Sequence, residues 1–118
     1  MHVLLINGSP HEKGCTYTAL SLVAGELNAA GITTEILNVG TKPVGGCIGC
    51  GGCAKGNGCV FGGVVNEAIE KARTADAFVF GTPVHYASAS GNMTSFLDRL
   101  AYAGGKYLAY KPAAICAS

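Results

Sequence analysis

Residues 2–18 read HVLLINGSPHEKGCTYT, and this stretch decides the fold. Residues 2–7 form an apolar run that Gly8 ends. A run without polar alternation is typical of a central parallel strand, which is buried on both faces. From Thr16 to Ala30 the apolar residues recur at three- and four-residue spacing, which predicts an amphipathic helix that Gly31 ends. The apolar face of this helix consists of Leu20, Val23, Ala24 and Leu27.

The same alternation of strand and helix patterns continues along the chain. Strand patterns occupy residues 33–39, 77–82 and 113–117, and helix patterns occupy residues 65–74 and 91–103. Their order predicts one α/β domain over residues 1–118, with a parallel sheet, helices on both faces and a ligand at the carboxyl ends of the strands. No helix follows the final strand, so we expect the sequence to be incomplete at its C-terminus. Met93, Phe96 and Leu97 are expected in the core.

Composition and charge exclude several classes of protein. Apolar residues make up 49% and charged residues 13% of the chain, the opposite of a disordered composition. The net charge is +1 and the basic residues are scattered, which argues against a nucleic-acid or polybasic membrane surface. No apolar run approaches the about 20 residues of a membrane span. The chain opens directly in a strand pattern without a signal peptide, so we expect a cytoplasmic protein with reduced thiols.

The turn from the first strand into the first helix has the composition of a phosphate-binding loop. Gly8 permits a sharp turn, and Ser9, Thr16 and Thr18 offer hydroxyl donors beside the free N–H groups of the helix start. The loop lacks the Lys-Ser/Thr pair of a Walker loop and the dinucleotide fingerprint G-x-G-x-x-G. The alternative is an ordinary strand-to-helix turn with a threonine N-cap.

The pattern G-S-P-x-x-x-G-x-T after an apolar strand resembles the FMN-phosphate loop of the flavodoxin-like NADPH-dependent FMN reductases. The resemblance covers essentially the whole chain and implies a flavodoxin-like doubly wound sheet of order 2-1-3-4-5, here ending after the fourth strand. Many members carry Arg at the position of His11, so neutral donors would hold the phosphate here, with Lys13 a solvated loop charge or a helper. The implied contacts are Ser9, His11, Gly14, Cys15, Thr16, Tyr17 and Thr18.

A second segment, residues 81–99, resembles the part of the same family that lines the isoalloxazine ring. His85 and Tyr86 each offer an aromatic face and a polar group to a flavin. The alternative is that both side chains are merely exposed loop residues. Asp98 and Arg99 are interpreted as a structural pair. The ring contacts that the resemblance implies are Pro83, Val84, His85, Tyr86, Ala87 and Ser90.

A cysteine-rich loop at residues 45–60 contains four of the six cysteines, with the spacing C-x2-C-x2-C-x5-C. Three thiolates on two-residue gaps suit one iron–sulfur cubane, and the spacing is close to the bacterial ferredoxin pattern. A zinc site is the alternative to an iron–sulfur cluster, although the second half-site of a zinc motif is missing. A loop that holds no cluster is the third alternative. The candidate ligands are Cys47, Cys50, Cys53 and Cys59.

This cysteine motif also resembles that of the iron–sulfur flavoproteins, a branch of the same family in which the cysteines hold a 4Fe–4S cluster near the FMN of a neighbouring subunit. Cys15 and Cys116 are interpreted as buried small residues. Members of the family assemble as homodimers or homotetramers, which the resemblance implies for this chain.

Two functions from different classes follow. The first is an FMN-dependent oxidoreductase that takes electrons from NAD(P)H or a reduced carrier, with no side chain acting as an obligatory acid or base. The second is an electron carrier with FMN and a 4Fe–4S cluster, reduced by a ferredoxin-like partner. A third hypothesis is a zinc-stabilised binding module.

Overall fold

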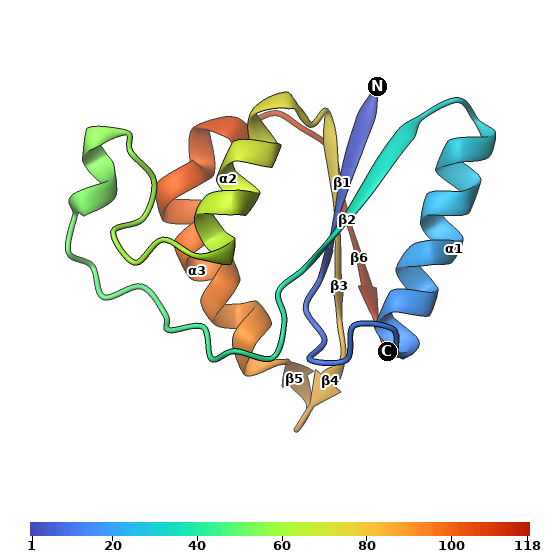
Figure 1. Ribbon diagram of the computed structural model, residues 1–118, viewed down its shortest axis with the longest axis horizontal. Helices are drawn as coiled ribbons and strands as arrows, with labels where there is room; N and C mark the ends of the chain where they lie inside the picture. Colours follow the sequence, from blue (N-terminus) through green and yellow to red (C-terminus); the bar gives the residue numbers. More distant parts are fainter.

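The computed structural model describes residues 1–118 and contains a four-stranded parallel sheet (Figure 1). The spatial order of the strands is β2-β1-β3-β6, and all three pairings are parallel. This order matches the first four positions of the expected 2-1-3-4-5 arrangement, so the predicted α/β fold is confirmed. The strands are β1 (His2–Asn7), β2 (Thr33–Asn38), β3 (Ala77–Thr82) and β6 (Ala113–Ala117).

Helices cover both faces of the sheet. Helix α1 (Cys15–Ala29) lies on one face, and α2 (Val64–Thr74) and α3 (Gly91–Leu108) lie together on the other (Figure 1). Helix α3 is longer than the predicted segment 91–103, because the glycine at 104 does not end it. A Cβ atom at Gly104 would lie 2.9 Å from Cγ1 of Ile69, so the glycine allows α2 and α3 to approach closely.

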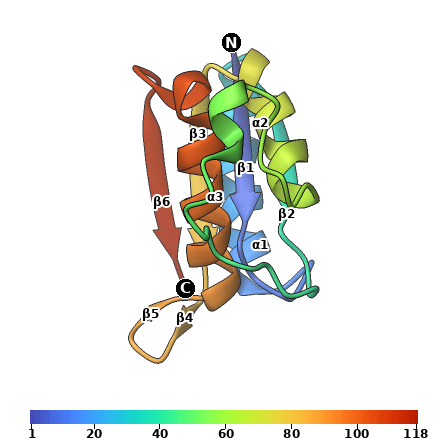
Figure 2. The ribbon, with the colours of Figure 1, turned by 90° about the vertical axis from the view of Figure 1, so that its left-hand side faces the viewer.

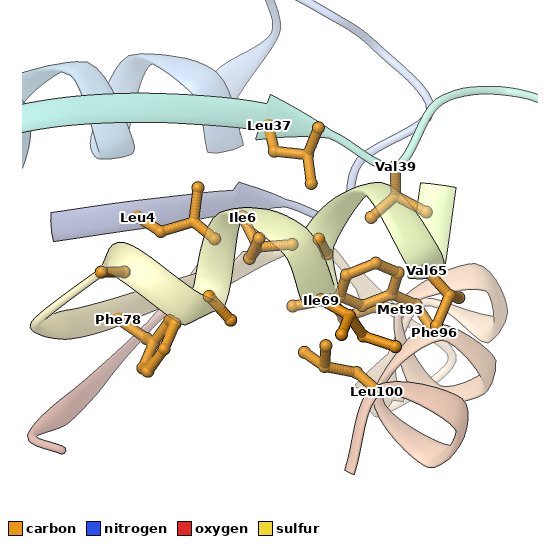
Figure 3. Packing of buried hydrophobic residues seen from close by; sticks show 13 residues of the cluster. Leu4, Ile6, Leu37, Val39, Val65, Ile69, Phe78, Met93, Phe96 and Leu100 are labelled. Atoms are coloured by element: carbon orange, nitrogen blue, oxygen red, sulfur yellow. The ribbon is translucent and has the colours of Figure 1, made fainter. Parts of the chain in front are cut away.

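The core is divided by the sheet into two unequal parts. The larger cluster has 13 buried residues between the sheet and the α2–α3 pair (Figure 3). The smaller cluster has 5 buried residues and lies under α1. The predicted core positions Met93 and Phe96 are 1% and 0% exposed, and Leu97 packs against the larger cluster, which confirms that prediction.

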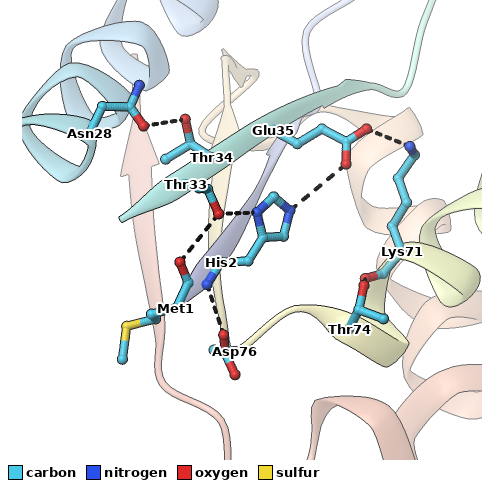
Figure 4. Close-up of polar contacts among 9 residues, drawn as sticks. All are labelled: Met1, His2, Asn28, Thr33, Thr34, Glu35, Lys71, Thr74 and Asp76. Atoms are coloured by element: carbon cyan, nitrogen blue, oxygen red, sulfur yellow. Dashed lines mark hydrogen bonds and ion pairs between the residues drawn. The ribbon is translucent and has the colours of Figure 1, made fainter. Parts of the chain in front are cut away.

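Polar contacts fasten the amino ends of the strands together (Figure 4). The His2 amide donates to Oδ2 of Asp76 at 2.8 Å, and Nδ1 of His2 lies 2.8 Å from Oγ1 of Thr33. Lys71 of α2 pairs with Glu35 of β2. This pairing raises the pKa of Lys71, chiefly through its hydrogen bond to Glu35. These polar groups serve structure, which leaves the opposite end of the sheet as the place for a site.

Two local elements were not predicted. A 3-10 turn, η1 (Gly52–Lys55), interrupts the long glycine-rich loop, which lies on the outer side of the α2–α3 pair (Figure 1). A short hairpin of β4 (Val84–His85) and β5 (Ser88–Ala89) projects beyond the carboxyl end of β3 (Figure 2). None of the three helices has the length and apolar character that crossing a bilayer requires.

The two isolated cysteines differ from their predicted environment. Cys15 is exposed, because it is the first residue of α1 and lies beside the open turn. Cys116 is only half-buried, since β6 is the edge strand and packs just one side against the smaller core cluster. The interpretation of both as buried residues was therefore wrong. The same edge leaves Ile115 78% exposed.

Candidate functional site

The carboxyl ends of β1, β3 and β6 meet at one end of the sheet. The Gly8 amide donates to the carbonyl of Gly81 at 2.8 Å, which joins the turns after β1 and β3. The Ser118 amide donates to the Thr82 carbonyl at 3.1 Å, and the Val84 amide donates to the Ser118 carbonyl at 2.8 Å. The two segments that the sequence predicted as phosphate loop and ring segment are therefore neighbours.

Asn7 shapes the first turn from below. Its side chain is fully buried, and its Oδ1 accepts a hydrogen bond from the Ser9 amide at 3.1 Å. Its Nδ2 donates to Oδ1 of Asn38 at 2.9 Å and lies 3.4 Å from the Glu12 carbonyl. The Ser9 hydroxyl in turn accepts from the His11 amide at 3.0 Å. Sequence reasoning missed Asn7, although a polar residue closing an apolar strand is the kind of signal that could have found it.

The amino end of α1 is open. Its N-cap is Gly14, no side chain caps it, and its first turn carries no acidic residue. The N–H groups of a first helical turn have no partner inside the helix, and the helix dipole makes this end positive. The alternative of a threonine N-cap is therefore wrong. Instead, Thr18 donates its hydroxyl to the Gly14 carbonyl, and Oγ1 of Thr16 lies 2.9 Å from Oγ of Ser118.

The predicted phosphate contacts differ widely in exposure. Ser9 and Thr16 are 4% and 2% exposed, so both are buried. The partly exposed residues are Gly14 and Tyr17, and the exposed ones are His11, Cys15 and Thr18. The start of α1 offers backbone N–H groups and hydroxyls, and its first turn carries no carboxylate side chain. Such a donor set fits a phosphate dianion.

The predicted ring segment forms the β4–β5 hairpin. Tyr86 and Ala87 occupy its turn with φ angles of 48° and 64°, a left-handed conformation that residues other than glycine adopt at a cost. Tyr86 is fully exposed and His85 is exposed as well. Pro83 is partly buried and Val84 is half exposed. The structure thus presents aromatic groups at the rim of the strand-end site.

Ser90 fastens this hairpin to the first turn. It is 3% exposed and is the N-cap of α3, where its Oγ accepts from the Met93 amide at 3.2 Å. The same hydroxyl donates to the Gly8 carbonyl at 2.9 Å. The Ser90 amide donates to Oγ1 of Thr82. The hydroxyl of Ser90 is therefore used by the protein itself and sets the distance between the two loops.

The four cysteines of the long loop line one cavity of about 230 Å³. Cys47 and Cys50 are exposed, Cys53 and Cys59 are partly buried, and all are free thiols. No three His, Cys, Asp or Glu side chains stand close enough together to hold a metal ion. The largest cavity, about 450 Å³, adjoins this loop and lies between segments 39–44 and 61–64.

Cys59 differs from the other three in its chemistry. Burial raises the pKa of its thiol, but a hydrogen bond from the Phe61 backbone and the hydrogen bond and charge of Arg99 outweigh burial, so the pKa lies below the ordinary cysteine value. Nε of Arg99 is 3.3 Å from Sγ of Cys59. Arg99 makes no ion pair with Asp98, and its hydrogen bonds go to Cys59, Gly45 and Gly62 of the cysteine-rich segment instead.

The donor set of this loop fits a thiolate-bound metal centre. Its residues offer four free thiols, and the turns between them run through glycines with positive φ, such as Gly49 at 69° and Gly51 at 74°. The Gly49 amide already donates to Sγ of Cys47 at 3.4 Å, a contact of the kind that stabilises a cluster thiolate. Soft thiolates without carboxylate ligands suit iron–sulfur clusters or zinc.

Comparison with known proteins finds a matching family and similar sequences. The sequence model of the family described as NADPH-dependent FMN reductase matches residues 1–118. An iron-sulfur flavoprotein of Archaeoglobus fulgidus is 33% identical over 99 residues, which cover 84% of this chain and 48% of that protein. An iron-sulfur flavoprotein of Methanocaldococcus jannaschii is 30% identical over 99 residues, which cover 84% of this chain and 51% of the relative. The chain thus spans about half the length of these curated relatives.

Solved structures share the fold. An NAD(P)H:quinone oxidoreductase from Methanothermobacter marburgensis superposes with a TM-score of 0.72 at 20% identity, covering 99% of this chain and 64% of that one. RosB, solved with bound 8-demethyl-8-formylriboflavin-5'-phosphate, gives a TM-score of 0.72 at 18% identity, covering 100% of this chain and 52% of that one. At these identities the likeness concerns the fold.

Proposed function

Because the chain belongs to the NADPH-dependent FMN reductase family, we propose that it binds FMN where β1, β3 and β6 end and passes electrons from NAD(P)H to an acceptor. The observation that carries this proposal is the open amino end of α1, which follows the β1 turn that the Ser90 hydroxyl joins to the segment after β3. Ser118 links this helix end to the hairpin of residues 84–89: its hydroxyl lies 2.9 Å from Oγ1 of Thr16 in α1, and its carbonyl accepts from the Val84 amide at 2.8 Å. A helix end with free N–H groups beside a second ligand-contacting loop is a suitable place for the phosphate of a larger ligand.

The phosphate would be held by neutral donors. The first-turn N–H groups of α1 supply the positive end of a helix dipole. The Ser9 hydroxyl accepts from the His11 amide and keeps its own proton to donate, whereas the Thr18 hydroxyl donates to the Gly14 carbonyl and would have to turn to reach a phosphate. His11 and Lys13 are exposed, so neither is fixed as a counter-ion by a protein contact. Binding of this kind depends on the placement of neutral hydrogen-bond donors more than on positively charged side chains.

The ring would lie against Pro83, Val84, His85 and Tyr86. When bound, FMN supplies the redox chemistry: it accepts a hydride, two electrons with one proton, from NAD(P)H and gives the electrons to an acceptor. The contribution of this chain is orientation, since the hairpin fixes the aromatic side chains at the rim and Ser90 fixes the spacing to the phosphate turn. No general acid or base from these loops is part of the proposal.

Replacing Gly14 by aspartate tests the phosphate anchor. Its φ of −91° suits a side chain, although a Cβ would press on the exposed His11 at 3.1 Å. An Asp at the N-cap is more stabilising than glycine by only about a few tenths of a kcal/mol, but it places a negative charge where the phosphate would bind. We expect G14D to keep or raise thermal stability while binding FMN on the order of tenfold to a hundredfold more weakly than G14N, by flavin fluorescence titration.

G14N is the matched control, because asparagine has the same shape and capping capacity without the charge. Riboflavin provides a second comparison. The wild-type protein should bind FMN more tightly than riboflavin, and G14D should lose that preference. Equal affinities of wild-type protein for FMN and riboflavin, or equal FMN affinities of G14D and G14N, would contradict the anchor.

A second candidate function is an electron carrier that combines FMN with a 4Fe–4S cluster. The observation in its favour is that Cys47, Cys50, Cys53 and Cys59 line one cavity. The relatives from Archaeoglobus fulgidus and Methanocaldococcus jannaschii are both named iron-sulfur flavoproteins. In this candidate a ferredoxin-like partner reduces the protein, which then converts between one-electron and two-electron transfer.

The cofactor content of anaerobically isolated protein separates the candidates. Iron and acid-labile sulfide near four per chain favour the carrier, as expected of one 4Fe–4S cluster. FMN without iron, together with rapid oxidation of NADPH, favours the reductase. Zinc without FMN would favour the binding module.

We also propose that the chain forms a homodimer or homotetramer. Large apolar side chains are exposed around the cysteine cavity, and such a patch is typical of an interaction surface. These side chains are Ile48, Val60, Phe61 and Tyr102, with exposed fractions of 68%, 63%, 55% and 76%. Light scattering at micromolar concentration measures the assembly, and a monomer would contradict it.

A further inference from the structure

Arg99 is a buried cation without a carboxylate partner. Its residue surface is 6% exposed, and none of the ion pairs of the structure includes it. Removing a charge from water costs several kcal/mol unless hydrogen bonds and an opposite charge offset the loss. The hydrogen bonds are present, but no acidic side chain supplies the opposite charge. The guanidinium instead points at the cysteine loop.

The contacts of Arg99 join both ends of that loop. One Nη donates to the Gly45 carbonyl at 3.3 Å, two residues before the first cysteine. The other Nη donates to the Gly62 carbonyl at 2.9 Å, three residues after the last cysteine. Nε is directed at Sγ of Cys59, and the guanidinium lies 5.4 Å from the ring centre of Phe61. A single side chain of α3 therefore closes the segment that carries all four thiols.

Cys59 is also held through its backbone. Its amide donates to Oδ1 of Asn66 at 2.8 Å, and Nδ2 of Asn66 donates to its carbonyl at 2.9 Å. Asn66 lies in the first turn of α2. The preceding Gly58 has a φ of 78°, and a Cβ there would lie 2.8 Å from Oδ1 of Asn66. Cys59 is thus fixed by two helices, whereas Cys47 and Cys50 lie on the exposed part of the loop.

We propose that Arg99 is a positioning residue for a four-thiolate metal centre in this loop, and that Cys59 is the preformed ligand around which the other three cysteines close. Arg99 supplies the positive charge and the N–H···S hydrogen bond, and Asn66 fixes the backbone. This inference rests on the iron–sulfur candidate and is independent of the FMN site.

The two residues affect different properties of the centre. A 4Fe–4S centre with four thiolates is an anion, and one-electron reduction makes it more negative. A guanidinium and a hydrogen bond to a ligand sulfur favour the reduced state, so they raise the reduction potential. Asn66 touches only the backbone of Cys59, so it contributes to retention of the cluster more than to its potential.

The experiment uses protein reconstituted anaerobically with ferrous iron and sulfide, and compares Arg99→Met, Arg99→Lys and Asn66→Ala. Lys106→Met is the control, because it removes an exposed cation from the same helix. We expect R99M to raise the ratio of oxidised to reduced cluster about tenfold at a fixed potential. For one electron this corresponds to a midpoint potential about 59 mV lower than that of the wild type. R99K, which keeps the charge, should shift it less, and K106M should not shift it.

For N66A we expect loss of iron to a chelator to be at least about threefold faster, with little change in potential. Far-ultraviolet circular dichroism of each variant reports whether it is folded. Loss of iron from R99M but not from R99K, with the circular dichroism spectrum unchanged, also supports the proposal. A potential and an iron content of R99M equal to those of K106M would overturn it.

The same measurements separate this inference from the flavin proposal. Wild-type protein that takes up FMN but no iron overturns the role of Arg99 and leaves the FMN site standing. Wild-type protein that takes up iron but no FMN overturns the FMN site and leaves the role of Arg99 standing.

Discussion

Ser90 shows how one side chain sets the geometry of the candidate flavin site. Its hydroxyl caps α3 and also donates to the Gly8 carbonyl, so it supports an element and a loop at once. We expect Ser90→Ala to lower the free energy of unfolding by about 1–2 kcal/mol, because α3 loses its N-cap and the Gly8 carbonyl loses its hydrogen-bond donor. FMN affinity should fall as well, because the two loops lose their link.

Chemical denaturation followed by circular dichroism measures this change. Ser88 provides the control, since it is exposed in β5 and its side chain makes no hydrogen bond within the protein. Ser88→Ala should change stability by less than about 0.5 kcal/mol. Similar losses in S88A and S90A would show that the hydroxyl of Ser90 has no special role.

Sequence patterns predicted the two loops that the structure brings together at the carboxyl ends of the strands, but not the contacts that their side chains make. The apolar run, Gly8 and the hydroxyl residues predict the turn, because those signals are local. The roles of Asn7 and Arg99 depend on partners far along the chain: Asn7 bonds to Asn38, and Arg99 bonds to Gly45 and Gly62. Such contacts exist only after β1 pairs with β2 and α3 packs against the loop, so no spacing rule reveals them.

Adjacent glycines in α3 are expected to respond in opposite ways to the same substitution. A Cβ at Gly104 would meet Cγ1 of Ile69 at 2.9 Å, whereas a Cβ at Gly105 has open space. We expect Gly104→Ala to lower stability by about 1–3 kcal/mol through overpacking of α2 against α3. Gly105→Ala should raise stability by about 0.5–1 kcal/mol, because glycine is a poor helix former. Thermal denaturation of the two variants checks both signs, and equal effects would contradict the packing argument.

The elements that sequence analysis missed were set by tertiary context. Gly104 and Gly105 look like a helix end, yet the contact with Ile69 requires a glycine inside α3. The β4–β5 turn lacks the usual Asn-Gly signal, since Tyr86 and Ala87 hold its left-handed conformations. The long strands and helices, apart from residues 104–108 of α3, were predicted correctly because their apolar patterns are strong enough to decide them locally.

In the whole molecule, the buried hydrophobic residues are divided unequally between the two faces of the sheet. The sheet separates a cluster of 13 buried residues under α2 and α3 from a cluster of 5 under α1. Local opening follows the amount of buried apolar contact, so an element with a small core opens at lower free energy. Helix α1 carries the proposed phosphate site at its amino end. The weakest face of the molecule is thus the one that the ligand would stabilise.

Native-state hydrogen exchange tests this consequence. Without ligand, we expect amides of α1 to exchange through openings of lower free energy than amides of α3, because α1 covers the smaller cluster. Every opening of α1 removes the phosphate donors, so FMN at about 100 times its Kd should slow that exchange about 100-fold, a stabilisation of about 2.7 kcal/mol. Riboflavin at the same concentration should slow it far less, since it lacks the phosphate. If FMN slowed exchange in α3 and left α1 unchanged, the flavin would be bound elsewhere, and the open end of α1 would have no part in holding it.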